Sequence, residues 1–405
     1  MRSTPRAPRA ALAPGLAALL GALALTGCGA GAQTDPEPAV TTTPAPVRTL
    51  YVQAPLSGPA ADEGRAMVDA VRLIVDQAGG IAGKVRVVVR ALDDGGRATA
   101  TDSRRCAANA ERAVQDPGAL AVIGTYELAC SERALAVLRP SGLRLISPVN
   151  AADRLPGALR LAPTVADEGT AAAQVGHALG AARMAIVSRR PGAAAGFTRG
   201  LARAAPALGE SPLVQLDASK TSTGGIVGAL VAGKVKAVAL AGSPGRWAID
   251  LLRAIALLPP ATRPSVVAPE GFDTLAFLDA AGPAAEGVRV ISRLVPAEQL
   301  GGAARSFASA YSDLHGEPPP VAAYAADAAE TVLKAAALSG LSRAAMSTAF
   351  TALPAHDSLL GHWAGTPTGG ITPRRLAVLV VDGGAFRVER VVSIADTLPP
   401  SGDVK

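Results

Sequence analysis

Short apolar runs alternate with longer amphipathic segments along residues 48–300, and this alternation is the main structural signal in the chain. The runs are rich in β-branched residues, and several are almost continuously apolar, which is typical of strands that are covered on both faces. The segments between them are Ala-rich and have helical periodicity. Such alternation predicts parallel sheets with right-handed crossovers. The predicted strands are 48–53, 84–90, 119–124, 143–147, 184–188, 213–216, 235–239, 265–268 and 288–292, and the predicted helices are 64–77, 99–115, 131–139, 167–179, 196–205, 222–231 and 246–257.

The pattern changes after about residue 300. Three longer helices are predicted at 303–315, 321–338 and 342–353. Two β-rich runs, 376–381 and 385–392, then flank Asp382-Gly383-Gly384, which is a strong β-hairpin signal. Because nine strand–helix units are too many for one small sheet, the sequence predicts an α/β fold with two Rossmann-like, doubly wound lobes.

The first 27 residues predict an export signal. Three arginines precede the apolar run 10–25, which is short for a membrane span and is interrupted by Pro14. The run ends in Leu-Thr-Gly-Cys, which resembles the bacterial lipobox and implies a lipid on Cys28 and cleavage before it. The Thr/Pro-rich segment 28–47 cannot bury a core, so it is interpreted as a tether from the membrane, and 399–405 as a loose tail.

Composition limits the classes of partner. Hydrophobic residues make up 49% of the 405 positions, which excludes a mostly disordered chain, and aromatics make up 3%, which weakens any site that needs stacked rings. The formal net charge is +6. Removing the three leader arginines leaves 36 basic and 33 acidic residues, a net charge of +3. This balance is too small to indicate nucleic-acid binding.

Three cysteines are present, and Cys28 is assigned to the lipid. Cys106 and Cys130 remain, 24 positions apart. An exported protein folds in an oxidising compartment, which favours a disulfide between them. Two buried free thiols are the alternative, because sequence alone does not prove a pairing.

Four predicted strands end in segments that could contact a ligand, since ligands collect at the carboxyl ends of strands in open α/β sheets. Ser57, the loop 126–131 and Asn150 offer hydroxyls, an amide and free backbone N–H groups, which suit a carboxylate. Glu270 offers a carboxylate, which suits an ammonium group. The alternative is ordinary turn, cap and solvated residues.

The order of these segments resembles that of the type I periplasmic solute-binding proteins, in the branch that binds leucine, isoleucine, valine and related amino acids or amides for ABC importers. The resemblance extends over about residues 48–395. The matching stretches are Ala54-Pro55-Leu56-Ser57-Gly58-Pro59, Gly79-Gly80-Ile81-Ala82-Gly83-Lys84, Asp93-Asp94, Val122-Ile123-Gly124, Leu145-Ile146-Ser147-Pro148, Arg160-Leu161-Ala162-Pro163, Pro269-Glu270-Gly271, Ala285-Glu286-Gly287 and Tyr324-Ala325-Ala326-Asp327-Ala328.

The resemblance implies a hinged fold that closes over its ligand, with lobe 1 at 48–163 plus 296–372 and lobe 2 at 164–295 plus 373–398. It implies a monomer that delivers its ligand to an ABC permease at the extracytoplasmic face of the membrane, without a cofactor. Glu270 matches the acid that contacts the ligand ammonium, and Ser243 matches a position in the second lobe of the ligand cleft. The positions that match the carboxylate side of the site are Tyr126, Leu128, Ala129, Val149, Asn150 and Ala151.

Three positions depart from the family pattern. Ala151 stands where a hydroxyl is frequent, Ala195 precedes Gly196 where an aromatic residue is common, and Ser243 stands where an aromatic residue is frequent. Smaller side chains at these positions of the ligand cleft leave space for a ligand bulkier than leucine or of another class. The aromatic residues expected near the mouth, with ordinary packing as the alternative, are Tyr126, Trp247 and Phe272.

Other functions find less support. The chain has no HExxH, P-loop or G-x-S-x-G motif, and its four histidines are scattered, so an enzyme is not predicted. A sensing or interaction lipoprotein that uses the same scaffold without transport stays open as the alternative.

Overall fold

The computed structural model describes residues 45–189, 192, 194–209, 213–338, 342–351 and 353–395. The predicted leader 1–27, Cys28, most of the tether 28–47 and the tail 399–405 lie outside the described residues.

Six strands form the first sheet, in the order β2-β3-β1-β4-β5-β6. β2 pairs antiparallel with β3, and the other neighbours pair in parallel, as the sequence pattern predicts. The strands are β1 (Val47–Ala54), β2 (Ile81–Ala82), β3 (Val85–Asp93), β4 (Ala119–Gly124), β5 (Leu145–Ser147) and β6 (Ala158–Arg160).

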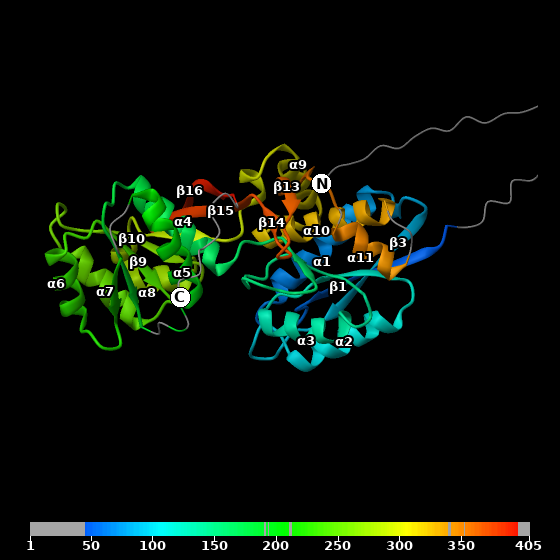
Figure 1. The fold of residues 1–405 in the computed structure, drawn as a ribbon, viewed down its shortest axis with the longest axis horizontal. Helices are drawn as coiled ribbons and strands as arrows, with labels where there is room; N and C mark the ends of the chain where they lie inside the picture. Colours follow the sequence, from blue (N-terminus) through cyan, green and yellow to red (C-terminus); the bar gives the residue numbers. More distant parts are fainter. Residues whose placement is uncertain are drawn as a thin grey trace, which may run out of the picture. The chain divides into compact units, whose positions relative to one another are not determined.

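Side chains of β1 alternate between two cores, because successive residues of a strand point to opposite faces of the sheet. Leu50 and Val52 pack in the core that contains helices α1, α9 and α10, whereas Tyr51 packs against α2 and α3. Figure 1 shows α1 and α10 on one side of β1 and α2 and α3 on the other. The helices around this sheet are α1 (Ala61–Gln77), α2 (Ser103–Gln115), α3 (Leu128–Leu138), α9 (Gly302–His315), α10 (Pro320–Leu338) and α11 (Arg343–Thr351).

Seven strands form the second sheet, in the order β16-β15-β11-β10-β9-β7-β8. The run from β11 to β8 is parallel, and β15 joins it antiparallel and pairs with β16. The strands are β7 (Met184–Ser188), β8 (Val214–Asp217), β9 (Ala237–Ala241), β10 (Ser265–Pro269), β11 (Arg289–Ser292), β15 (Arg374–Asp382) and β16 (Ala385–Ile394).

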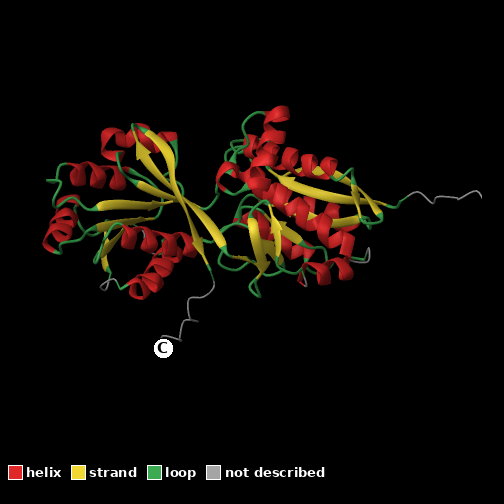
Figure 2. Cartoon of the chain, turned by 90° about the horizontal axis from the view of Figure 1, so that it is seen from above, coloured by secondary structure: helices red, strands yellow, loops and turns green. Residues whose placement is uncertain are grey.

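Helices cover both faces of this second sheet as well (Figure 2). Val238 and Leu240 of β9 pack in the core with α6, α7 and α8, and the intervening alanines of β9 pack with α4 and α5. The helices are α4 (Val165–Ala178), α5 (Ala195–Ala204), α6 (Thr223–Ala232), α7 (Arg246–Ala256) and α8 (Leu275–Ala281), and single 3-10 turns occur at Ala205–Leu208, Gly282–Ala285 and Ala297–Gln299. Among the described residues, no helix is both long and apolar enough to cross a membrane.

A small third sheet was not predicted from the sequence. Its antiparallel strands are β12 (His356–Ser358), β13 (Gly361–Gly365) and β14 (Ile371–Thr372). Trp363 of β13 is 1% exposed, packs in the core of the first sheet, and donates from Nε1 to Ser358 Oγ at 2.8 Å.

Several predicted boundaries were shifted for local reasons. α2 begins at Ser103 rather than at 99, because Thr101 forms a bridge with Gly95 and Asp102 caps the helix by accepting from the backbone N–H of Arg104. β9 begins two residues late, because the N–H of Val235 bonds to Leu230 O at the end of α6. The predicted hairpin is present, and its Gly383 and Gly384 adopt positive φ values of 60° and 76°, a conformation that glycine adopts without strain.

Candidate functional site

Arg293, which directly follows β11, binds both acidic residues around it. Its Nε lies 3.0 Å from Glu168 Oε1, and its Nη2 pairs with Glu270 Oε1. Its Nη1 donates to Val149 O at 3.2 Å, and its own backbone N–H donates to Glu270 Oε2 at 3.0 Å. A single guanidinium therefore joins three segments that are far apart in sequence.

The parallel pairing of two strands brings Glu270 and Arg293 together. Pro269 at the end of β10 pairs with Ile291 of β11, so the residues that follow both strands emerge at the same edge of the sheet. Glu168 lies in the first turn of α4. There, Thr164 and Asp167 form a capping box, with Thr164 Oγ1 accepting from the Asp167 N–H at 3.1 Å.

Tyr324 of α10 fixes the backbone of residues 293–295 by hydrogen bonds. Its hydroxyl donates to Arg293 O at 3.3 Å and accepts from the N–H of Val295 at 3.2 Å. The Tyr324 side chain is buried, and this burial raises the pKa of its hydroxyl. The hydroxyl therefore stays protonated and keeps residues 293–295 in place.

Burial and charge oppose each other within this cluster. Glu168 is 3% exposed, and burial raises the pKa of its carboxyl to about 8, although the Arg293 guanidinium favours the charged form. Burial lowers the pKa of Arg293, but Glu270 and Glu168 outweigh it and the net shift is upward. Arg293 is therefore a permanent cation beside a Glu270–Glu168 pair in which Glu168 holds its proton far longer than an exposed glutamate.

Tyr126 lies close enough to Glu270 and Arg293 for their charges to affect the pKa of its hydroxyl. Burial, followed by the charges of Glu63 and Glu270, raises the pKa of Tyr126 to about 12, and Arg293 acts in the opposite direction. The phenol is therefore a neutral hydrogen-bond donor at ordinary pH.

The polar side chains expected to hold a ligand carboxylate already have partners within the protein. Asn150 is 2% exposed, donates from Nδ2 to Ser131 Oγ at 2.9 Å and accepts from the Ala152 N–H at 2.8 Å. Ser131 Oγ also lies 2.5 Å from Thr125 Oγ1. These three side chains form a buried network behind the first turn of α3.

Ser57 faces a different group of residues. Its hydroxyl donates to Asp93 Oδ2 at 2.8 Å, and Arg105 Nη1 lies 2.9 Å from the same oxygen. Ser57, Glu127 and Ala129 line a surface hollow of about 950 Å³. Two predicted positions, Ser57 and Ala129, thus share one hollow.

The remaining predicted positions differ in exposure. Leu128 and Ala129 are exposed on the first turn of α3, Val149 is 6% exposed, Ala151 is half-buried, and Ser243 is exposed in the loop before α7. Phe272 is fully buried and packs edge-on against Phe277 with ring centroids 5.2 Å apart, which agrees with the alternative of ordinary packing.

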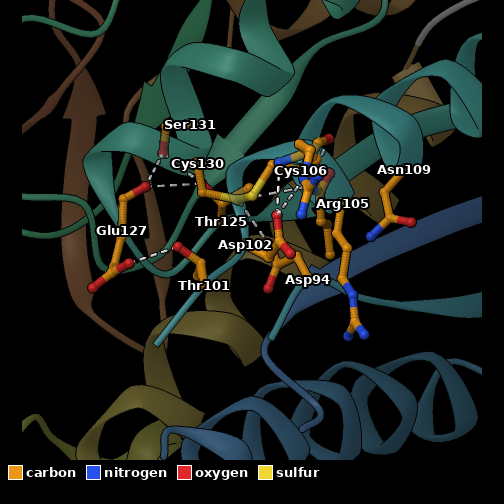
Figure 3. The surroundings of a disulfide bond; sticks show 12 residues. Asp94, Thr101, Asp102, Arg105, Cys106, Asn109, Thr125, Glu127, Cys130 and Ser131 are labelled. Carbon is orange, nitrogen blue, oxygen red and sulfur yellow. Dashed lines mark hydrogen bonds and ion pairs between the residues drawn. A yellow bond between two sulfur atoms is a disulfide. The ribbon is translucent and has the colours of Figure 1, made fainter. Parts of the chain in front are cut away.

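Cys106 of α2 and Cys130 of α3 form a disulfide in the structure, with Sγ atoms 2.01 Å apart (Figure 3). Gln53 Nε2 donates to Cys106 O at 3.0 Å. Asp94 Oδ2 lies 3.1 Å from Cys130 Sγ, and burial raises the pKa of Asp94 to about 7. The bridge joins two adjacent helices on one face of the first sheet.

Sequence reasoning missed Arg293 and Glu168. The feature that made Glu270 a candidate, a charged residue just after a predicted strand, is also present at Arg293. Glu168 gives a weaker signal, because an acid in the first turn of a helix is common as a partner of the helix dipole.

Comparisons with known proteins agree on one family. A family model described as periplasmic binding protein matches residues 52–385. A structure assigned to branched-chain amino acid ABC transport in Rhodospirillum rubrum is 25% identical, with a TM-score of 0.67 over 84% of this chain and 99% of that chain. No relative among curated proteins matches the sequence.

Two further structures share the fold and contain ligands. LivJ from Streptococcus pneumoniae, in complex with isoleucine, is 17% identical with a TM-score of 0.63 over 86% of this chain and 99% of that chain. A solute-binding protein of an ABC transporter from R. palustris, in complex with benzoate, is 18% identical with a TM-score of 0.59 over 87% of this chain and 98% of that chain.

Proposed function

The chain belongs to the periplasmic binding protein family, in the leucine/isoleucine/valine group, and from this premise we propose that it captures a small organic acid or amino acid and delivers it to the permease of an ABC importer. The isoleucine and benzoate of the two ligand-bound neighbours share a carboxylate and little else. A ligand with a carboxylate is therefore the proposal with the broadest support.

The cluster around Arg293 is the observation that carries this proposal. It brings together segments that follow β5, β10 and β11 and the start of α4. The carboxyl ends of parallel strands are where open α/β folds bind ligands. Tyr126, after β4, adds a neutral donor near the same charges. We place the binding site here.

The lobe boundaries are part of the proposal. Strands of the first sheet lie within residues 47–160, and those of the second within 184–394. This division supports lobe 1 at 48–163 plus 296–372 and lobe 2 at 164–295 plus 373–398. The chain would pass between the lobes near 163, 295 and 372, and bending there would close the lobes over a ligand.

Anchoring rests on the sequence of the leader. We propose that Cys28 carries the lipid and that the protein works, as a monomer, on the extracytoplasmic face of the membrane. Palmitate labelling in a bacterial host should mark the wild-type chain and not Cys28→Ala. Equal labelling of both would exclude Cys28 as the acceptor.

The transport role is tested by uptake. A ligand found by thermal shift should stabilise the protein as its concentration exceeds Kd. Deleting the gene should then abolish high-affinity uptake of that ligand. Unchanged uptake, with a transcriptional response to the ligand that is lost on deletion, would favour the sensing alternative.

A further inference from the structure

We propose, on the basis of the binding function proposed above, that the ligand is a small organic acid without an amino group, because Arg293 occupies the carboxylate that an ammonium group would need. Arg293 binds both oxygens of Glu270, one through Nη2 and one through its backbone N–H. A ligand ammonium would have to displace the guanidinium or approach it as a like charge.

Displacing Arg293 would be costly. Its Nε also pairs with Glu168, whose side chain is 4% exposed, and its Nη1 donates to Val149 O. Moving the guanidinium away would leave the buried Glu168 carboxyl and the Val149 carbonyl each without a donor, and each such loss is unfavourable. Tyr324 in turn holds the backbone on both sides of the Arg293 carbonyl. Arg293 is therefore a fixed part of the site.

Donors for a carboxylate remain in the same place. A guanidinium has five N–H groups, and among the described residues three of those of Arg293 are used, which leaves one on each terminal nitrogen. The Tyr126 hydroxyl has no hydrogen-bond partner within the described part of the chain. These hydrogen-bond donors suit an anionic ligand.

One other acid needs a control. Glu63, in the first turn of α1, acts on Tyr126 and is the alternative acceptor for an ammonium group. If Glu63 served that role, amino acids would bind better than the corresponding deaminated acids. Comparing such pairs directly decides between the two outcomes.

The experiment is calorimetric titration of the purified full-length chain with matched compounds. The sets are leucine, 4-methylpentanoate and 4-methylpentanamide, and phenylalanine, 3-phenylpropanoate and 3-phenylpropanamide. In at least one set the acid should bind ten or more times as tightly as the amino acid and the amide. Tighter binding of the amino acid or the amide would overturn the proposal while leaving the binding function intact. Binding of none of these compounds, together with no thermal shift from any amino acid or carboxylic acid, would overturn both.

Variants assign the effect to the guanidinium. Arg293→Gln should weaken binding of the acid tenfold or more and, by freeing Glu270, reduce the preference over the amino acid. Arg289→Gln is the matched control, because Arg289 lies on the same strand and pairs with Glu389 at 2.7 Å, away from the site. It should leave affinity unchanged.

If Arg293→Gln does not fold, Glu168→Gln/Arg293→Gln removes the buried acid and its partner together and gives the same readout. Unchanged affinity for the acid in whichever of these Arg293 variants folds would exclude Arg293 as its receptor.

Discussion

Replacing Glu168 by glutamine should make the fold increasingly more stable than wild type as the pH rises from 5 to 8. Burial raises the pKa of Glu168 from its ordinary value of 4.5 to about 8. Between these values the native chain keeps a proton that the unfolded chain loses, so stability is fully present below about pH 4.5 and falls as the pH rises towards 8. Glutamine imitates the protonated form and does not titrate.

The size of the effect follows from the pKa shift. One proton contributes about 1.4 kcal/mol per pH unit within the window, so the difference between wild type and Glu168→Gln has an upper limit of about 5 kcal/mol at pH 8. The pKa of about 8 already includes the contact with Arg293 at 3.0 Å, which favours the ionised form of Glu168. We expect a gain of a few kcal/mol for the variant.

Urea unfolding at pH 5, 6, 7 and 8 measures the effect. Wild type alone is not diagnostic, because burial also raises the pKa of Asp94 to about 7 and that of Asp327 to about 6. The difference between wild type and Glu168→Gln isolates one residue, and Glu132→Gln, on the exposed side of α3, is the matched control. If the free energies of unfolding of wild type and Glu168→Gln change in parallel with pH, or if the variant loses stability relative to wild type as the pH rises, Glu168 is ionised in the fold.

Three further changes test other parts of the structure. Cys106→Ala/Cys130→Ala should lower the free energy of unfolding by about 3 kcal/mol in urea, because the bridge links residues 24 positions apart and so restricts the unfolded chain. An unchanged free energy of unfolding after reductant is added to wild type would contradict this. Tyr324→Phe removes a hydroxyl that both donates and accepts, and should cost about 1–3 kcal/mol by the same assay, whereas an unchanged midpoint would exclude its role in fixing residues 293–295. Trp363→Ala should cost about 3–5 kcal/mol and lower Tm, because it empties a buried site, and a Tm within error of wild type would show that β13 does not contribute to the core.

The sequence predicted the fold best where a segment carries a clear local signal, such as a continuous apolar run or a turn sequence. β4 and β7 match their predicted ranges residue for residue, because both are continuous apolar runs followed by a helix. The hairpin of β15 and β16 was found from two glycines that accept positive φ. Each signal is local and strong, so tertiary contacts did not need to be known.

Several of the missed elements depend on contacts distant in sequence. β6 is three residues long and gains its strand character by pairing with β5. β12, β13 and β14 contain polar and glycine residues, and they are held by Trp363 packing in the core of the first sheet. A pattern along the chain does not encode such partners.

The candidate site shows the same limit in its chemistry. Residue type and place after a strand led to the predictions that Glu270 contacts an ammonium group and that Asn150 contacts a carboxylate. Sequence did not show that each already has a partner: Arg293 for Glu270, and Ser131 for Asn150. Because buried polar groups rarely stay unpaired, a polar residue found at a strand end must be weighed with the charged residues that follow neighbouring strands. Applied to the residues that follow β10 and β11, that rule pairs Glu270 with Arg293, and the pairing changes the expected ligand from a zwitterion to an anion.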